Sequence, residues 1–135
     1  MHDWHEQAKR HASEIDASLR PALALPPLLL VEDDELIRLT TAMHLQDLGR
    51  TVVEAGDGAA ALQSLAADPA LTILIADLGL PDMDGVTLIA RARELRPGLR
   101  VIVASGRDLQ EPIEGTVPLQ KPYNSEALQR ALATV

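Results

Sequence analysis

Five short aliphatic runs, separated by longer segments with helical spacing, constrain the fold of this 135-residue chain more than any other feature. The runs are Leu28–Val31, Thr51–Val53, Leu71–Ala76, Val101–Ala104 and Val117–Leu119. The third run, "LTILIA", is apolar almost throughout instead of alternating with polar residues, which is typical of strands covered on both faces. Alternation of such strands with helices predicts an α/β protein with a parallel sheet and helices on both sides.

Four segments carry the apolar stripe of an amphipathic helix. The stripes are Ile37, Thr41, Leu45 and Leu48; Ala59, Leu62 and Ala66; Val86, Ile89 and Ala90; and Leu128, Ala131 and Leu132. Gly49 is expected to end the first helix, and Asn124 or Ser125 to cap the last one. The interval after Val101–Ala104 lacks a clear stripe, so at most a short helical turn is expected there.

Residues 1–26 precede the first run and are predicted to form a separate unit. An apolar stripe at helical spacing extends from Trp4 to Leu19, and Pro21 would end such a helix. We therefore expect an amphipathic helix and linker over residues 1–26, followed by one domain over residues 27–135. The apolar face of the helix would cover the domain or pair with a second copy to form a homodimer.

Composition excludes several classes of function. The net charge of −8 argues against binding to nucleic acid or to anionic membranes. No apolar run is long enough to span a membrane, and the N-terminus "MHDWHEQAKR" lacks the apolar core of a signal peptide. The chain has no Cys, which excludes a thiolate metal site and a cysteine nucleophile. We expect a cytoplasmic protein with neither nucleic acid nor membrane as a partner.

Polar residues with complementary chemistry follow four of the five runs. Glu32 and Asp33 follow the first run, Asp77 the third, Ser105 the fourth and Lys121 the fifth. Parallel strands present their carboxyl ends at one edge of a sheet, where ligands bind. A single polar residue at a strand end is common, but three acids, a hydroxyl and an ammonium group on one edge predict a functional site.

Clustered carboxylates need a compensating cation, because like charges a few ångströms apart disfavour ionisation. Mg²⁺ suits such a site, since it binds one or two carboxylates and keeps its other positions for water or phosphate oxygens. An aspartate beside a metal ion, a lysine and a hydroxyl can take up a phosphoryl group as an aspartyl phosphate. The constellation therefore predicts a phosphoryl-acceptor site.

Four segments carry a resemblance to a known family. They are "LLLVEDDELIR", "IADLGLPDMDG", "VIVASGR" and "LQKPY", and they resemble the signature segments of the response-regulator receiver domain. This domain is the phospho-acceptor module of two-component signalling. The resemblance extends from Leu28 to Val135 and implies a flavodoxin-like, doubly wound sheet of five parallel strands in the order 2-1-3-4-5.

The resemblance assigns roles in phosphoryl transfer. Asp77 would be the aspartate that becomes phosphorylated. Ser105 would be the switch hydroxyl that forms a hydrogen bond with the phosphoryl group. Lys121 would pair with the phosphoryl oxygens, and family members usually make the following Lys–Pro bond cis.

The resemblance also implies a Mg²⁺ site at the same edge. Its ligands would be Glu32, Asp33 and Asp77, together with the backbone carbonyl of Gly79. Of the acidic pair Glu32 and Asp33, Asp33 is the one expected to bind the ion directly. Three further acids are expected to act as turn or cap residues: Asp34, Asp82 and Asp84.

Two departures from the family pattern concern the fourth helix and the fifth strand. Pro118 occupies the position where many members have a switch aromatic residue. The interval from Ser105 to Lys121 is 16 residues, which is short for the family, and Pro112 and Gly115 interrupt it. We therefore expect a reduced fourth helix and an incomplete output face.

The expected function is that of a signalling switch, phosphorelay or phosphate-sink module without a DNA-binding output of its own. It would accept a phosphoryl group from a histidine kinase or a histidine phosphotransfer protein and lose it by slow self-hydrolysis, so it would not be an enzyme. One alternative is a receiver-like protein-interaction module that works without phosphorylation. Another is a Mg²⁺-dependent phosphatase, which would need a second acid where this chain has Gly79.

Overall fold

The computed structural model describes residues 25–106 and 112–135 of the chain. The helix predicted within residues 1–26 therefore lies outside the described residues, as does part of the interval predicted to hold only a short helical turn. None of the described helices combines the length and the hydrophobicity that a membrane-spanning segment needs.

Five parallel strands form one sheet in the order β2-β1-β3-β4-β5. The strands are β1 (Leu28–Val31), β2 (Val52–Ala55), β3 (Ile73–Asp77), β4 (Arg100–Ser105) and β5 (Thr116–Gln120). Each strand contains most of one of the five aliphatic runs. The prediction of a doubly wound parallel sheet with the order 2-1-3-4-5 is confirmed.

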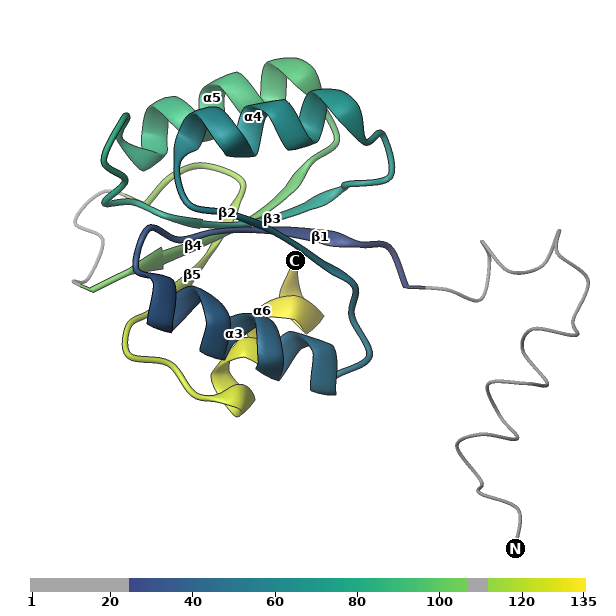
Figure 1. Ribbon diagram of the computed structural model, residues 1–135, viewed down its shortest axis with the longest axis vertical. Helices are drawn as coiled ribbons and strands as arrows, with labels where there is room; N and C mark the ends of the chain where they lie inside the picture. The colour runs from purple at the N-terminus through teal and green to yellow at the C-terminus, as the bar shows by residue number, and fades with distance from the viewer. Residues whose placement is uncertain (1–24, 107–111) are drawn as a thin grey trace, which may run out of the picture.

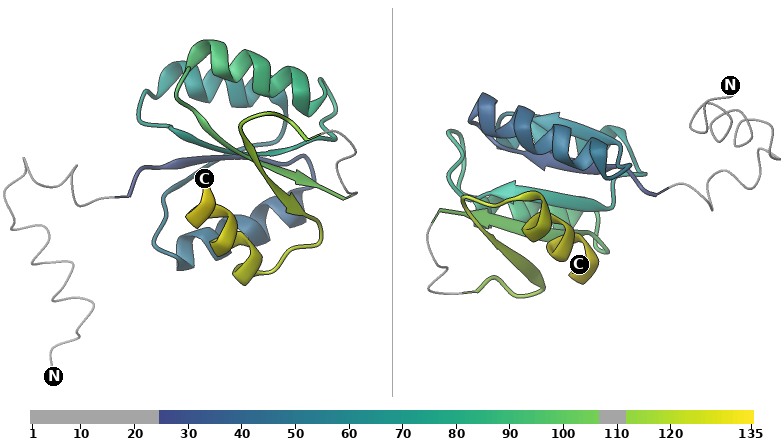
Figure 2. Two further views of the ribbon diagram at one scale, coloured as in Figure 1. Left: turned by 180° about the vertical axis from the view of Figure 1, so that it is seen from behind. Right: turned by 90° about the horizontal axis from the view of Figure 1, so that it is seen from below.

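Two helical layers enclose the sheet (Figure 1). One face is covered by α3 (Glu35–Asp47) and α6 (Ser125–Thr134), and the other by α4 (Gly58–Ala67) and α5 (Gly85–Leu95). The two further views in Figure 2 show the same layered arrangement. Between β4 and β5 the described residues contain no helix, which agrees with the expected reduction of the fourth helix.

Alternate residues of each strand enter different halves of the core. The residues of β1 and β3 that pack toward α3 and α6 are Leu28, Leu30, Ile73 and Ile75. The residues that pack toward α4 and α5 are Leu29, Val31, Leu74 and Ala76. Because both faces are covered, these strands must be apolar at every position. Burial of one such Leu, Ile or Val contributes about 1.5–3 kcal/mol, which holds the strand ends in place.

The predicted buried faces hold largely for α3 and α6 but only in part for α4 and α5. The buried residues include Gly58, Ala61 and Leu65 in α4 and Leu88, Ile89 and Ala92 in α5. Of the predicted stripes, Ile89 is buried and Leu62 is half-buried against the core, whereas Ala59, Ala66, Val86 and Ala90 are exposed. Adjacent faces of an Ala-rich helix differ little in hydrophobicity, so the residue pattern does not fix the rotation of the helix.

An Asp or Asn side chain caps the N-terminus of each described helix. Asp34, Asp57, Asp84 and Asn124 accept hydrogen bonds of 2.7–3.0 Å from the backbone N–H groups of Ile37, Ala60, Thr87 and Ala127. The predicted cap roles of Asp34, Asp84 and Asn124 are confirmed. Each cap lies a few residues after the end of a strand, so capping determines where the chain turns from the sheet into the next helix.

Candidate functional site

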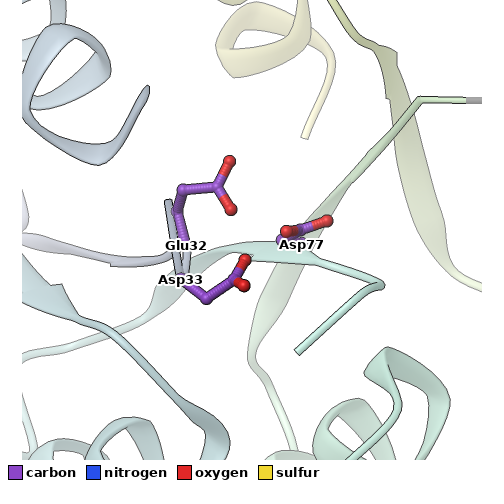
Figure 3. Close-up of side chains that lie close together, drawn as sticks. All are labelled: Glu32, Asp33 and Asp77. Carbon is purple, nitrogen blue, oxygen red and sulfur yellow. The ribbon is translucent and has the colours of Figure 1, made fainter. Parts of the chain in front are cut away.

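The three acids that follow β1 and β3 meet at the carboxyl edge of the sheet. Parallel pairing keeps β1 and β3 in register, so Glu32 and Asp33 leave β1 beside Asp77, the last residue of β3. One carboxylate oxygen from each acid lies within 4.8 Å of the others. Figure 3 shows the carboxylates of Glu32 and Asp33 on the side that faces Asp77. The structure thus brings together the acids that the sequence singled out.

Lys121 brings a positive charge into this group of acids. Its Nζ lies 2.5 Å from Glu32 Oε1 and 3.3 Å from Asp77 Oδ2. The backbone N–H of Lys121 donates a 2.7 Å hydrogen bond to the carbonyl of Ser105, and the bond between Lys121 and Pro122 is cis, as the resemblance implies. Among the residues that the structure describes, one ammonium group therefore lies with three acids, which leaves this group with an excess of acids over cations.

Ser105 ends β4 beside the acids. The β3–β4 register aligns Asp77 with Ala104, so Ser105 lies one residue beyond the partner of Asp77. A Cβ atom added at the next residue, Gly106, would meet no atom within 4 Å. The described residues therefore leave the space beside Gly106 unfilled.

Glu32 is the buried member of the group, with 2% of its surface exposed. Burial raises the pKa of Glu32 from its ordinary value to about 7; the hydrogen bond and the negative charge that it shares with Asp77 act in the same direction. Lys121 opposes this shift only in part. Without a further cation, Glu32 therefore holds a proton up to about neutral pH.

Asp77 shifts in the opposite direction. Burial alone would raise its pKa, but hydrogen bonds with Glu32 and with the backbone N–H of Gly79, together with the charge of Lys121, lower the pKa overall. The hydrogen bond from Gly79 N–H to Asp77 Oδ1 is 3.2 Å long. At neutral pH the Asp77 carboxylate is thus ionised, which is the state that a nucleophile requires.

The donor atoms of the site fit a hard divalent cation. Glu32 Oε2 is buried and makes no hydrogen bond within the part of the chain that the structure describes, which is unfavourable for a carboxylate oxygen. A bound cation would satisfy this oxygen, and the exposed Asp33 would leave room for water on the cation. Gly79 is an exposed residue of the loop that follows Asp77.

Two supporting contacts were missed by the sequence analysis. Arg38 Nη1 donates a 2.8 Å hydrogen bond to the backbone carbonyl of Glu32, and its Nε lies 3.4 Å from Glu54 Oε1. The hydroxyl groups of Thr41 and Tyr123 are 2.8 Å apart and join α3 to the loop after Lys121. Arg38 lies in the first helical turns after the acids, so its position near them could have been predicted from the sequence. No local pattern links Thr41 with Tyr123.

Comparisons with known proteins agree on one family. The family model of the response regulator receiver domain matches residues 28–133. The response regulator receiver protein CpdR of Brucella abortus is 33% identical over 104 residues, which cover 72% of this chain and 85% of CpdR. Sensor kinase CckA of the same organism is 36% identical over 80 residues, which cover 58% of this chain but only 8% of the kinase.

Solved structures give the same result. The receiver domain of the hybrid histidine kinase CckA has a TM-score of 0.72 at 30% identity, and the match covers 80% of this chain and 96% of that domain. The Vibrio cholerae chemotaxis protein CheY4 has a TM-score of 0.77 at 27% identity and is covered to 99%, with 83% of this chain. Both matches extend over nearly the whole of the known structure.

The raised pKa of Glu32 has a consequence for stability. As the pH rises from about 4.5 to about 7, the unfolded chain loses this proton while the folded protein keeps it. The free energy of unfolding of the metal-free protein should therefore fall across this window, on the order of 3 kcal/mol. Asp77, with its lowered pKa, and Lys121, with its raised pKa, keep their charges throughout this range.

Glu32→Gln should remove this pH dependence, because glutamine keeps the shape of the side chain but cannot ionise. We expect the variant to be as stable as the wild type near pH 4.5 and more stable at pH 8. Urea unfolding of both proteins in the presence of a chelator measures the difference. Other groups that titrate in the same window are common to both proteins. If the free energy of unfolding depends on pH in the same way in both proteins, the raised pKa does not belong to Glu32.

Proposed function

From the premise that this chain belongs to the response regulator receiver domain family, we propose that Asp77 accepts a phosphoryl group from a phosphohistidine. Transfer would require Mg²⁺ held by Glu32, Asp33 and Asp77, with the carbonyl of Gly79 as a further ligand. The protein would act as a switch, relay or sink for phosphate in two-component signalling. It would be a phospho-acceptor protein and not a turnover enzyme.

The observation that carries this proposal is the group formed by Glu32, Asp33, Asp77 and Lys121. Three carboxylates within 4.8 Å of one another provide hard oxygen ligands, and Lys121 lies 3.3 Å from the proposed acceptor. A core ion pair with a purely structural role would need only one acid for one lysine. The excess of acids supports a site that is completed by a cation and a phosphoryl group.

The reaction follows from the charges at the site. An oxygen of the ionised Asp77 carboxylate attacks the phosphorus, and the P–N bond to the imidazole breaks with its electron pair moving to the nitrogen. Lys121 neutralises charge on the transferring oxygens, and the Ser105 hydroxyl would donate a hydrogen bond to one of them. Mg²⁺, when bound, would supply further positive charge there. Attack by water on the aspartyl phosphate later restores Asp77 and releases inorganic phosphate.

The exposed face of α3 supports docking of a protein that carries the phosphohistidine, either a histidine kinase or a histidine phosphotransfer protein. Its exposed apolar side chains are Leu36, Ile37, Leu39 and Met43, which are 37–72% exposed. A hollow of about 420 Å³ separates this face from the loop after β5, and Ile37, Gly106, Lys121 and Tyr123 contribute to its lining. An apolar patch beside the acceptor site suits a helix that brings its histidine to Asp77.

Acetyl phosphate tests the acceptor directly, because it needs no partner protein. With Mg²⁺ present, intact-mass spectrometry should show the gain of one phosphoryl group on the wild type. Chelation of the metal or the substitution Asp77→Asn should abolish the gain. A similar gain without Mg²⁺, or on the Asn variant, would contradict the proposal. No gain on the wild type would favour an interaction module that works without phosphorylation.

A matched pair of substitutions tests the docking face. Ile37→Asn should slow transfer from a phosphohistidine donor severalfold and leave the rate with acetyl phosphate unchanged, because only the protein donor contacts α3. Leu95→Asn is the control, since Leu95 is similarly exposed but lies at the far end of α5. Equal transfer rates for both variants would show that α3 is not part of the docking surface.

A further inference from the structure

The loop that follows Asp77 is attached to α4 by an acid with no assigned role beyond a turn. Asp82 Oδ1 accepts a hydrogen bond from Gly58 N–H, and Asp82 Oδ2 accepts one from Ala59 N–H, both at 2.9 Å. These two N–H groups belong to the first turn of α4, where backbone donors have no partner within the helix. They lower the pKa of the Asp82 carboxyl, which is therefore ionised at neutral pH.

A close packing contact reinforces the same junction. A Cβ atom added at Gly58 would lie 2.5 Å from Sδ of Met83, so the absence of a side chain at Gly58 lets Met83 approach the helix. Asp82 and Met83 are adjacent and both contact the N-terminus of α4. The junction thus combines two hydrogen bonds with an apolar contact, and it joins segments that are 24 residues apart in the chain.

The α4 helix does not require Asp82 as its cap. Asp57 already fills the N-cap position and accepts a 2.7 Å hydrogen bond from Ala60 N–H. The two bonds to Asp82 therefore add attachment between the helix and the acceptor loop. Their main structural effect is on the loop, which is exposed at Pro81 and Asp82 and packs against the core through Leu80 and Met83 on either side.

The position of this loop matters for the acceptor site. Gly79 lies three residues before Asp82, and its N–H group contacts Asp77. A bridge between Gly79 and Asp84 and a 3.1 Å hydrogen bond from Gly85 N–H to the carbonyl of Leu78 close the base of the loop. In the remaining part of the loop, the two hydrogen bonds of Asp82 to α4 add to the core packing of Leu80 and Met83.

We propose that Asp82 is a positioning residue of the acceptor site: by joining the loop to α4, it holds Gly79 against Asp77 and in place for the metal ion. Asp82 itself contacts neither Asp77 nor the metal-ligating acids. This inference rests on the proposed function for its effect on phosphorylation. Its effect on the Gly79 N–H group is a property of the protein without metal.

Asp82→Ala and Asp57→Ala form a matched pair that separates attachment of the loop from capping of the helix. Each substitution removes a carboxylate that accepts hydrogen bonds from N–H groups in the first turn of α4, so both should lower the thermal unfolding midpoint. Only Asp82→Ala should speed hydrogen exchange at Gly79 N–H in the metal-free protein, weaken Mg²⁺ binding severalfold and slow phosphorylation by acetyl phosphate. Asp82→Asn should restore these properties in part, because its amide oxygen can accept one of the two bonds.

The outcomes decide between the possible roles of Asp82. The inference would be overturned if Asp82→Ala and Asp57→Ala changed the rate of hydrogen exchange at Gly79 N–H and the affinity for Mg²⁺ by equal amounts. If the wild type neither binds Mg²⁺ nor accepts a phosphoryl group, the proposed function fails, and the exchange comparison still stands. In that case faster Gly79 exchange in Asp82→Ala alone supports the positioning role, and equal exchange rates refute it.

Discussion

An excess of negative charge at one edge of the sheet is the constraint on which the rest of the structure depends. Glu32, Asp33 and Asp77 converge there, and within the described part of the chain one ammonium group, that of Lys121, accompanies them. One acid, Glu32, is buried and keeps an oxygen without a hydrogen bond in the described structure. Such an arrangement is unfavourable for a protein that only needs to fold, and binding of a cation would make it favourable.

The fold maintains this arrangement through its most rigid parts. The strands that carry the acids are buried on both faces, so the aliphatic side chains of β1 and β3 fix the point at which each acid leaves the sheet. Helix caps determine the next turn of the chain, and Arg38 and Asp82 attach the loops around the acids to neighbouring elements. A preorganised site of this kind needs little rearrangement to bind its ligands.

The sequence predicts the strands and the members of the site because both signals are local. Strands covered on two faces appear as unbroken aliphatic runs, and the acids and Lys121 directly follow them. The rotation of α4 could not be predicted, since Ala61 and its Ala neighbours differ little in hydrophobicity. The hydrogen bonds of Thr41 with Tyr123 and of Asp82 with Gly58 depend on the packing of distant elements, which leaves no periodic trace in the sequence.

The central claim is that the acid group binds a divalent cation, and a titration with paramagnetic Mn²⁺ followed by NMR tests it most directly. Mn²⁺ prefers the same oxygen ligands as Mg²⁺ and broadens the signals of nearby amides. The account predicts broadening centred on Glu32, Asp33, Asp77 and Gly79, reversed by an excess of Mg²⁺. Broadening centred elsewhere, or none at millimolar Mn²⁺, would contradict it.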